Sequence, residues 1–144
     1  METVFSGGCL CGAVRYESTA APVVCGHCQC DDCRRSSGSG HCSHAGVPKA
    51  AVRITGNVST YDKAADSGNM VTRAFCGTCG AATHSLNSAM PDLIFLRASS
   101  LDDLEVFQPQ LIVYAARAAS WDHMDPALPA FAEVPPPDDM PIKV

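Results

Sequence analysis

The sequence lacks a long hydrophobic run, and it lacks a strong charge of either sign. No apolar stretch approaches the roughly 18 residues that a membrane helix needs. Residues 1–4 have neither the basic start nor the apolar stretch of a secretory signal. The net charge of −5 gives no general attraction to nucleic acid or to an anionic membrane. These absences predict a cytoplasmic protein whose partners are neither nucleic acids nor membranes.

Several enzyme motifs are missing as well. There is no glycine-rich nucleotide loop and no serine nucleophile elbow. No long amphipathic helix, internal repeat or interdomain linker stands out. A length of 144 residues fits one domain, and 47% hydrophobic residues can build a core. Short alternating segments between Gly, Pro and Ser clusters therefore predict a single domain with a mainly β fold.

The alternation of apolar and polar residues places the expected elements along the chain. Strands are expected at residues 13–17, 23–24, 41–45, 52–55, 59–61, 70–75, 93–96 and 111–115. A turn is expected at Gly7-Gly8, a loop or single helical turn at 34–40, a loop at 62–69, and an extended or mobile Pro-rich tail at 134–144. If residues 41–45 form a strand, Cys42 and His44 lie on the same face of it.

What the sequence has in abundance is cysteine. Nine cysteines are present, and an odd number cannot all pair as disulfides. They fall in C-x-C and C-x-x-C units, which in a reducing compartment hold metal more often than they form disulfides. The cysteines therefore predict a zinc protein.

The first metal group is expected from two short pairs that are far apart in the sequence. Structural zinc is tetrahedral and commonly bound by four thiolates about 2.3 Å away. The pairs Cys9/Cys11 and Cys76/Cys79 supply such a set. Small residues between and after Cys76 and Cys79 leave backbone N–H groups able to approach the sulfurs. The alternative is that these four residues are buried cysteines without a metal.

The second metal group is expected from Cys28, Cys30 and Cys33, which form one C-x-C-x-x-C unit. Three local ligands leave the fourth zinc position open, as in catalytic zinc sites. Zinc there would hold a substrate thiol as the nucleophilic thiolate or polarise a carbonyl. Cys25 is a candidate fourth ligand that would close the site and make it structural. His27 and Cys42 are the other candidates for that position.

Polar residues that follow Cys33 are candidates for substrate binding. Arg34 and Arg35 could bind carboxylates bidentately, or they could be solvated and offset the charge of the thiolates. Residues 36–39 could offer hydroxyl and backbone donors, or they could form an ordinary polar turn. Without paired spacing, the histidines are expected at the surface or in the core rather than as ligands: His41, His44, His84 and His123.

Three motifs together resemble a known family. They are G-G-C-L-C-G-A-V-R-Y from Gly7 to Tyr16, C-Q-C-D-D-C-R-R from Cys28 to Arg35, and F-C-G-T-C-G from residue 75 to 80. Their order and spacing resemble the glutathione-dependent formaldehyde-activating enzyme (GFA) family, which shares its domain with centromere protein V. The resemblance covers residues 3–133 and leaves 134–144 as a Pro-rich tail. Gln29 departs from the family, in which many members have His or Asn.

The resemblance implies a Mss4-like β-sheet fold that binds two zinc ions. It implies a structural zinc on Cys9, Cys11, Cys76 and Cys79, and a second, catalytic zinc on Cys28, Cys30 and Cys33. The implied activity is that of S-(hydroxymethyl)glutathione synthase, a carbon–sulfur lyase whose partners are a small thiol and an aldehyde. A non-catalytic zinc-stabilised binding module is the main alternative. Redox chemistry by the cysteines is a third hypothesis. The sequence does not indicate an oligomeric state.

Overall fold

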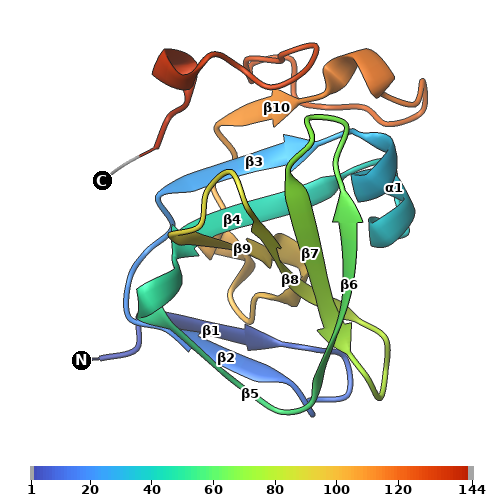
Figure 1. Ribbon diagram of the computed structural model, residues 1–144. Helices are drawn as coiled ribbons and strands as arrows, with labels where there is room; N and C mark the ends of the chain where they lie inside the picture. Colours follow the sequence, from blue (N-terminus) through green and yellow to red (C-terminus); the bar gives the residue numbers. More distant parts are fainter. Residues whose placement is uncertain (1, 143–144) are drawn as a thin grey trace.

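The computed structural model describes residues 2–142 as two β-sheets with little helix (Figure 1). The smaller sheet is antiparallel and has the order β1-β2-β5: Phe5–Gly8, Arg15–Ser18 and Val52–Thr55. The larger sheet has seven strands in the order β10-β3-β4-β9-β8-β7-β6. In chain order these are β3 Val24–Cys28, β4 Cys42–Pro48, β6 Val58–Ala64, β7 Met70–Cys76, β8 Ala82–Asn87, β9 Leu93–Arg97 and β10 Leu111–Val113. The predicted mainly β, Mss4-like fold of a single domain is confirmed.

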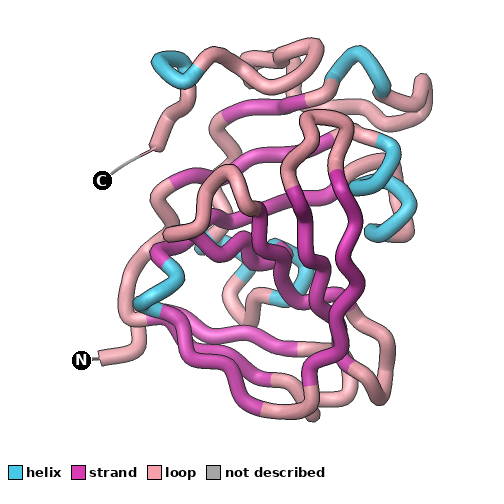
Figure 2. The backbone as a smooth tube through the Cα atoms, viewed as in Figure 1, coloured by secondary structure: helices cyan, strands magenta, loops and turns pink. Residues whose placement is uncertain are grey.

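Helical structure is confined to short segments (Figure 2). The α-helix α1 spans Asp31–Ser37 and ends at Gly38, whose φ of 79° suits a residue without a side chain. The 3-10 turns are η1 Lys49–Ala51, η2 Ala98–Ser100, η3 Leu104–Val106, η4 Ala115–Arg117 and η5 Pro137–Asp139. Within residues 2–142 no helix has the length and apolar character to cross a membrane.

The two sheets enclose the main core between them. Strand alternation turns Cys25 of β3, Ala45 and Val47 of β4, and Leu96 of β9 toward the smaller sheet, which contributes Phe5 and Tyr16. Ala45, Val47 and Leu96 are fully buried. Burying a side chain of the size of valine or leucine stabilises a fold by about 1.5–3 kcal/mol. The opposite face of the larger sheet faces away from this core and lines the cavity described below.

The structure corrects the expected turn at Gly7-Gly8. Both residues belong to β1, and Gly7 lies opposite Tyr16 in β2. A Cβ at Gly7 would lie 2.3 Å from the Tyr16 hydroxyl oxygen and 2.4 Å from the Ser100 carbonyl oxygen. Tyr16 and Ser100 share a buried hydrogen bond of 2.6 Å. Glycine is therefore required by the close approach of Tyr16 and of η2, and not by a turn.

Other boundaries also differ from the sequence prediction. The segment expected as a loop or one turn from residue 34 is helical from Asp31 to Ser37. Strand β6 continues to Ala64, so the predicted loop at 62–69 shrinks to residues 65–69. The sequence analysis missed β8, because its buried residues Thr83, His84 and Ser85 are polar and give no hydrophobic signal.

The C-terminal segment runs beside β10 and is extended except for η5 (Figure 1). Pro135 is buried, and the Gln110 side-chain amide donates to the Pro141 carbonyl at 3.5 Å. The tail up to residue 142 is thus attached to the domain. Residues 143–144 of the predicted tail lie outside the described residues.

Candidate metal centres and the adjoining cavity

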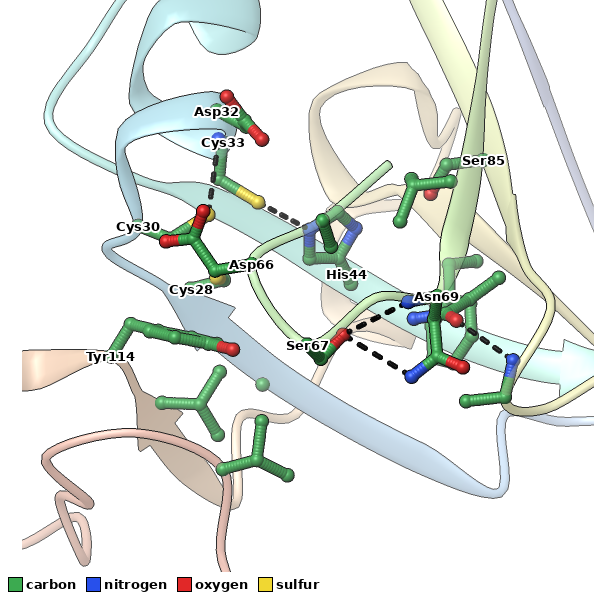
Figure 3. A pocket seen from close by; sticks show the side chains of 18 of the residues that line it. Cys28, Cys30, Asp32, Cys33, His44, Asp66, Ser67, Asn69, Ser85 and Tyr114 are labelled. Carbon is green, nitrogen blue, oxygen red and sulfur yellow. Dashed lines mark hydrogen bonds between the residues drawn. The ribbon is translucent and has the colours of Figure 1, made fainter. Parts of the chain in front are cut away.

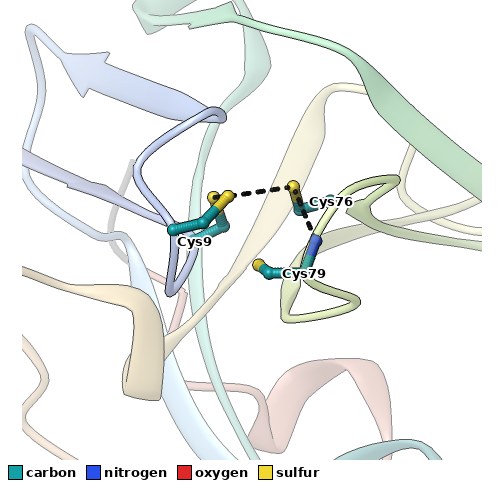
Figure 4. A group of neighbouring side chains, drawn as sticks. Cys9, Cys76 and Cys79 are labelled. Atoms are coloured by element: carbon teal, nitrogen blue, oxygen red, sulfur yellow. Dashed lines mark hydrogen bonds between the residues drawn. The ribbon is translucent and has the colours of Figure 1, made fainter.

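The first candidate centre is the four-cysteine group, Cys9, Cys11, Cys76 and Cys79 (Figure 4). All four sulfurs lie within 4.8 Å of one another. The Sγ–Sγ distance is 3.7 Å for Cys9–Cys11 and for Cys11–Cys76. A tetrahedral site with metal–sulfur bonds of about 2.3 Å places its ligands about 3.8 Å apart. The sulfurs therefore fit a tetrahedral thiolate site for zinc.

Backbone N–H groups surround the sulfurs of the four-cysteine group. The Val14 N–H donates to Cys9 Sγ at 3.2 Å and lowers the pKa of that thiol to about 6. The Thr78 and Cys79 N–H groups donate to Cys76 Sγ at 3.3 and 3.5 Å. This confirms the expectation that the turn around Cys79 brings backbone donors to the sulfurs, and it stabilises the thiolate form that a metal requires.

The second candidate centre is the three-cysteine group, Cys28, Cys30 and Cys33 (Figure 3). Cys28 ends β3, Cys30 is the N-cap of α1, and Cys33 lies in its first turn. Cys30 Sγ accepts the cap hydrogen bond from the Cys33 N–H at 3.3 Å. The strand end and the helix start thus bring three sulfurs within 4.8 Å of one another.

The pKa values of the three thiols are shifted in opposite directions. Hydrogen bonds from Cys28 and Cys33, supported by backbone N–H groups, lower the pKa of Cys30 to about 2. The hydrogen bond with Cys30 raises the pKa of Cys28 to about 12. The hydrogen bonds with Cys28 and Cys30 raise the pKa of Cys33. One thiolate is therefore favoured, and a dication is the group that would allow all three to ionise.

The candidate fourth ligands Cys25 and His27 do not join this group. Both lie in β3 on the face opposite Cys28, because successive strand residues point to opposite sides of a sheet. Cys25 belongs to the main core cluster. The His27 Nδ1 lies 2.8 Å from the Ser43 hydroxyl. The C-x-x-C unit that begins at Cys25 is a strand rather than a turn, so it does not gather its sulfurs.

Cys42 and His44 form a third group with Cys33. Cys42 pairs with Cys28 across β3 and β4, and the His44 Nε2 lies 3.5 Å from Cys33 Sγ. The Arg97 guanidinium donates to the buried Cys42 sulfur. Hydrogen bonding with Cys33, together with His44 and Arg97, lowers the pKa of Cys42 to about 4. The cation beside it disfavours a metal ion there and favours Cys42 as the partner of Arg97.

His44 is a site residue that the sequence analysis placed on the correct face but did not assign to the site. It lines the cavity described below, and its Nδ1 is a buried polar atom without a hydrogen-bond partner among residues 2–142. A buried unpaired nitrogen costs stability unless a water or a ligand group binds it. Alternation along residues 41–45 was the only sequence signal for this residue.

A cavity of about 620 Å³ adjoins the three-cysteine group. Its floor is formed by β3 and β10, and the turn between β6 and β7 lies over it with Asp66, Ser67 and Asn69 (Figure 3). Cys28, Cys30 and Cys33 all line the cavity, together with Tyr114. The four-cysteine group does not contribute to its lining. The cavity falls in the size range of small-molecule sites.

The cations around the cavity differ in whether they already have an anionic partner. Lys63 lies 2.5 Å from Asp32, and Arg117 lies 2.7 Å from Asp66. Arg35 and Arg73 also line the cavity, and neither forms an ion pair with another residue in the described part of the chain.

Of the two arginines singled out from the sequence, only Arg35 lines the cavity. Arg34 does not, and its side chain lies 3.7 Å from Asp31 one turn earlier. Sequence analysis missed Arg73, because no local motif connects β7 with the cysteines.

The remaining candidates have local roles. Ser36 and Ser37 donate to helix carbonyls of Cys33 and Arg34. His41 Nδ1 lies 2.9 Å from an Asp122 carboxylate oxygen, and His84 is buried in β8. His123 is exposed. None of these side chains lines the cavity.

The fold and the site together define a mainly β protein with cysteine groups able to hold metal ions, one of them beside a small-molecule cavity. The chain belongs to the glutathione-dependent formaldehyde-activating enzyme family, whose model matches residues 4–117. Membership supports a formaldehyde-activating or related zinc-binding function in general.

A solved structure supports the fold. The chain is similar to a Rhodobacter sphaeroides protein whose crystal structure was determined by structural genomics, with 20% sequence identity and a TM-score of 0.55. The alignment covers 88% of this chain and 98% of that one. None of the curated proteins that were compared with the sequence matches it.

Proposed function

We propose that the protein is a zinc-dependent carbon–sulfur lyase, similar to S-(hydroxymethyl)glutathione synthase, that forms and cleaves the adduct of a thiol and an aldehyde. One observation carries this proposal: the three-cysteine group lines a cavity, whereas the four-cysteine group does not. We assign a structural zinc to Cys9, Cys11, Cys76 and Cys79. We assign a second zinc to Cys28, Cys30 and Cys33, with its open position toward the cavity.

The reaction is an addition and its reverse. In the synthetic direction the thiol loses its proton, the sulfur electron pair forms the C–S bond, and the carbonyl oxygen gains a proton. In the lytic direction the hydroxyl proton leaves and the C–S electron pair returns to sulfur. A bound zinc supplies stabilisation of the substrate thiolate at neutral pH. No oxidant or reductant is needed, because the addition of a thiol to an aldehyde is redox-neutral.

Protein side chains bind the two halves of the adduct. Arg35 and Arg73 bind the carboxylates of an anionic thiol such as glutathione, since they are the cavity cations without an ion pair among residues 2–142. The His44 imidazole hydrogen-bonds the oxygen of the aldehyde half. The buried, unpartnered Nδ1 of His44 supports this assignment.

The placement of Cys25 in the core argues against a second site that Cys25 closes. A zinc-stabilised binding module without catalysis would be expected to saturate its metal with protein ligands. Three cysteines that line a cavity instead favour a metal position open to an incoming thiol.

Cobalt substitution tests the proposal, because cobalt reports its sulfur ligands by absorption. The spectrum of the cobalt-loaded protein is recorded with and without glutathione, in the wild type, in Cys28→Ser and in the matched control Cys25→Ala. We expect glutathione to change the spectrum in the wild type and in Cys25→Ala but not in Cys28→Ser. A spectrum that no low-molecular-weight thiol changes, and that Cys25→Ala alters, would overturn the proposal.

A further inference from the structure

The cavity has a second end that the proposed reaction with formaldehyde does not use. Cys28 lies at one end of β3 and Val24 at the other, and the four residue steps between them span roughly 13 Å. Both line the cavity. Besides Val24, the apolar side chains that line the cavity, among polar ones such as Ser85 and Asn87, include Met90, Phe95, Leu111, Val134 and Met140.

Two glycines allow these apolar side chains to lie flat on the sheet. Gly46 pairs with Val24 on one side and with Phe95 on the other. A Cβ at Gly46 would lie 2.6 Å from Val24 Cγ1 and 3.1 Å from the Phe95 ring. The missing side chain therefore leaves room for Val24 and Phe95 to meet above the strand. They form one continuous apolar floor at this end of the cavity.

The floor continues toward the three-cysteine group. A Cβ at Gly26 would lie 2.9 Å from Leu111 Cδ2, so the Leu111 side chain covers the strand between Val24 and Cys28. Val113 then pairs with Cys28 and also lines the cavity. An apolar path thus runs along β3 and β10 from Val24 to the sulfurs.

Neither formaldehyde nor glutathione matches this apolar end. Formaldehyde contributes one carbon to the adduct, and glutathione is a charged tripeptide whose carboxylates need Arg35 and Arg73. Covering apolar surface is favourable, and neither molecule would obtain that gain here. We propose that the aldehyde half of the substrate carries a hydrocarbon or aryl group that fills the end of the cavity around Val24, Phe95 and Met90. This inference rests on the proposed function.

Binding of linear thiols and alcohols tests the apolar end. Ethanethiol, butanethiol and hexanethiol, and the alcohols of the same lengths, are titrated calorimetrically into the zinc-loaded protein. We expect affinity to rise roughly threefold to fourfold for each added methylene, the value for burying a CH₂ group. The alcohols need no thiolate–metal contact, so they report the apolar end separately from the proposed chemistry.

Two methionine variants provide a matched comparison. Met90→Trp fills the cavity at a half-buried position, whereas Met70→Trp adds the same bulk at a residue that is 45% exposed and outside the lining. We expect Met90→Trp to abolish the dependence on chain length while ethanethiol still binds. Met70→Trp is expected to behave as the wild type.

Turnover then assigns the apolar group to the aldehyde. With glutathione as the thiol, we expect a higher kcat/KM for the hexanal adduct than for the formaldehyde adduct, with the order reversed in Met90→Trp. Affinities that do not depend on chain length, or equal effects of the two variants, would overturn the inference. A chain-length dependence that persists for the alcohols while no thiol changes the cobalt spectrum would overturn the proposed function and leave the apolar binding site supported.

Discussion

The two cysteine groups differ in how far apart their cysteines lie in the sequence and in what surrounds them. The four-cysteine group joins the turn after β1 to the end of β7, and Cys11 and Cys76 are 65 residues apart. The three-cysteine group comes from one stretch between β3 and α1. Backbone N–H groups donate to sulfurs of both groups, but only the second lines a cavity, whose Arg35 and Arg73 have no ion pair among the described residues. Ligands distant in sequence suit a structural role, and local ligands beside a cavity suit a reactive one.

The largest effect is expected from breaking the four-cysteine group. Cys76 is 1% exposed and ends β7. Cys76→Ser should remove a structural metal whose apparent binding free energy is about 10–16 kcal/mol, comparable with the roughly 5–15 kcal/mol that stabilises a whole domain. We expect an unfolded or insoluble protein, measured by circular dichroism and bound zinc. A folded variant with an unchanged Tm would contradict the structural role.

A smaller and different effect is expected at the three-cysteine group. Cys30→Ser removes a ligand but keeps a side chain that caps a helix well, so α1 should persist. We expect the fold to remain, one zinc to be lost, and kcat/KM to fall roughly a thousandfold, because a metal contributes several kcal/mol to catalysis. Metal analysis and thermal unfolding are measured with the activity. If Cys30→Ser instead unfolded the protein, the three-cysteine group would also be structural, and the two groups would not differ in role.

The neighbouring arginines allow a sharper test of the cavity. Arg35 lines it and Arg34 does not. Arg35→Ala should weaken binding of an anionic thiol by roughly tenfold or more, since hydrogen bonds to charged groups contribute about 1.5–3 kcal/mol. Arg34→Ala should have little effect, and Arg73→Ala should resemble Arg35→Ala. The measurement is KM for glutathione; equal effects of Arg34→Ala and Arg35→Ala would argue against the assigned binding mode.

The smallest effect is expected from a residue outside both groups. Burial lowers the pKa of His84 from 6.5 to about 4. The unfolded chain therefore binds more protons than the folded one between these values, and the free energy of unfolding should fall as the pH drops from 6.5 to 4. His84→Asn should make this decline shallower. Urea unfolding at several pH values, with bound zinc measured in parallel, separates this effect from acid release of the metal.

The sequence correctly predicted strands in which apolar and polar residues alternate. It missed a strand whose buried residues are polar. Strand β9 and the strand before Cys76 were found from their patterns. Strand β8 was missed, because its buried residues Thr83, His84 and Ser85 are polar and give no apolar alternation. Gly7 was assigned to a turn, because the approach of Tyr16 and Ser100 cannot be seen from local sequence.

The sequence by itself determined the short C-x-C and C-x-x-C units that supply both cysteine groups, since ligands held by tight turns depend on spacings that the chain carries locally. Only the tertiary structure decided which other side chains lie around the three-cysteine group. Strand alternation turned Cys25 and His27 away from Cys28, and pairing across β3 and β4 brought Cys42 and His44 toward Cys33. Arg73 reached the cavity through the order of strands in the sheet. Spacing fixes neighbours along the chain, whereas register and sheet order fix neighbours across it, and the latter require the folded protein.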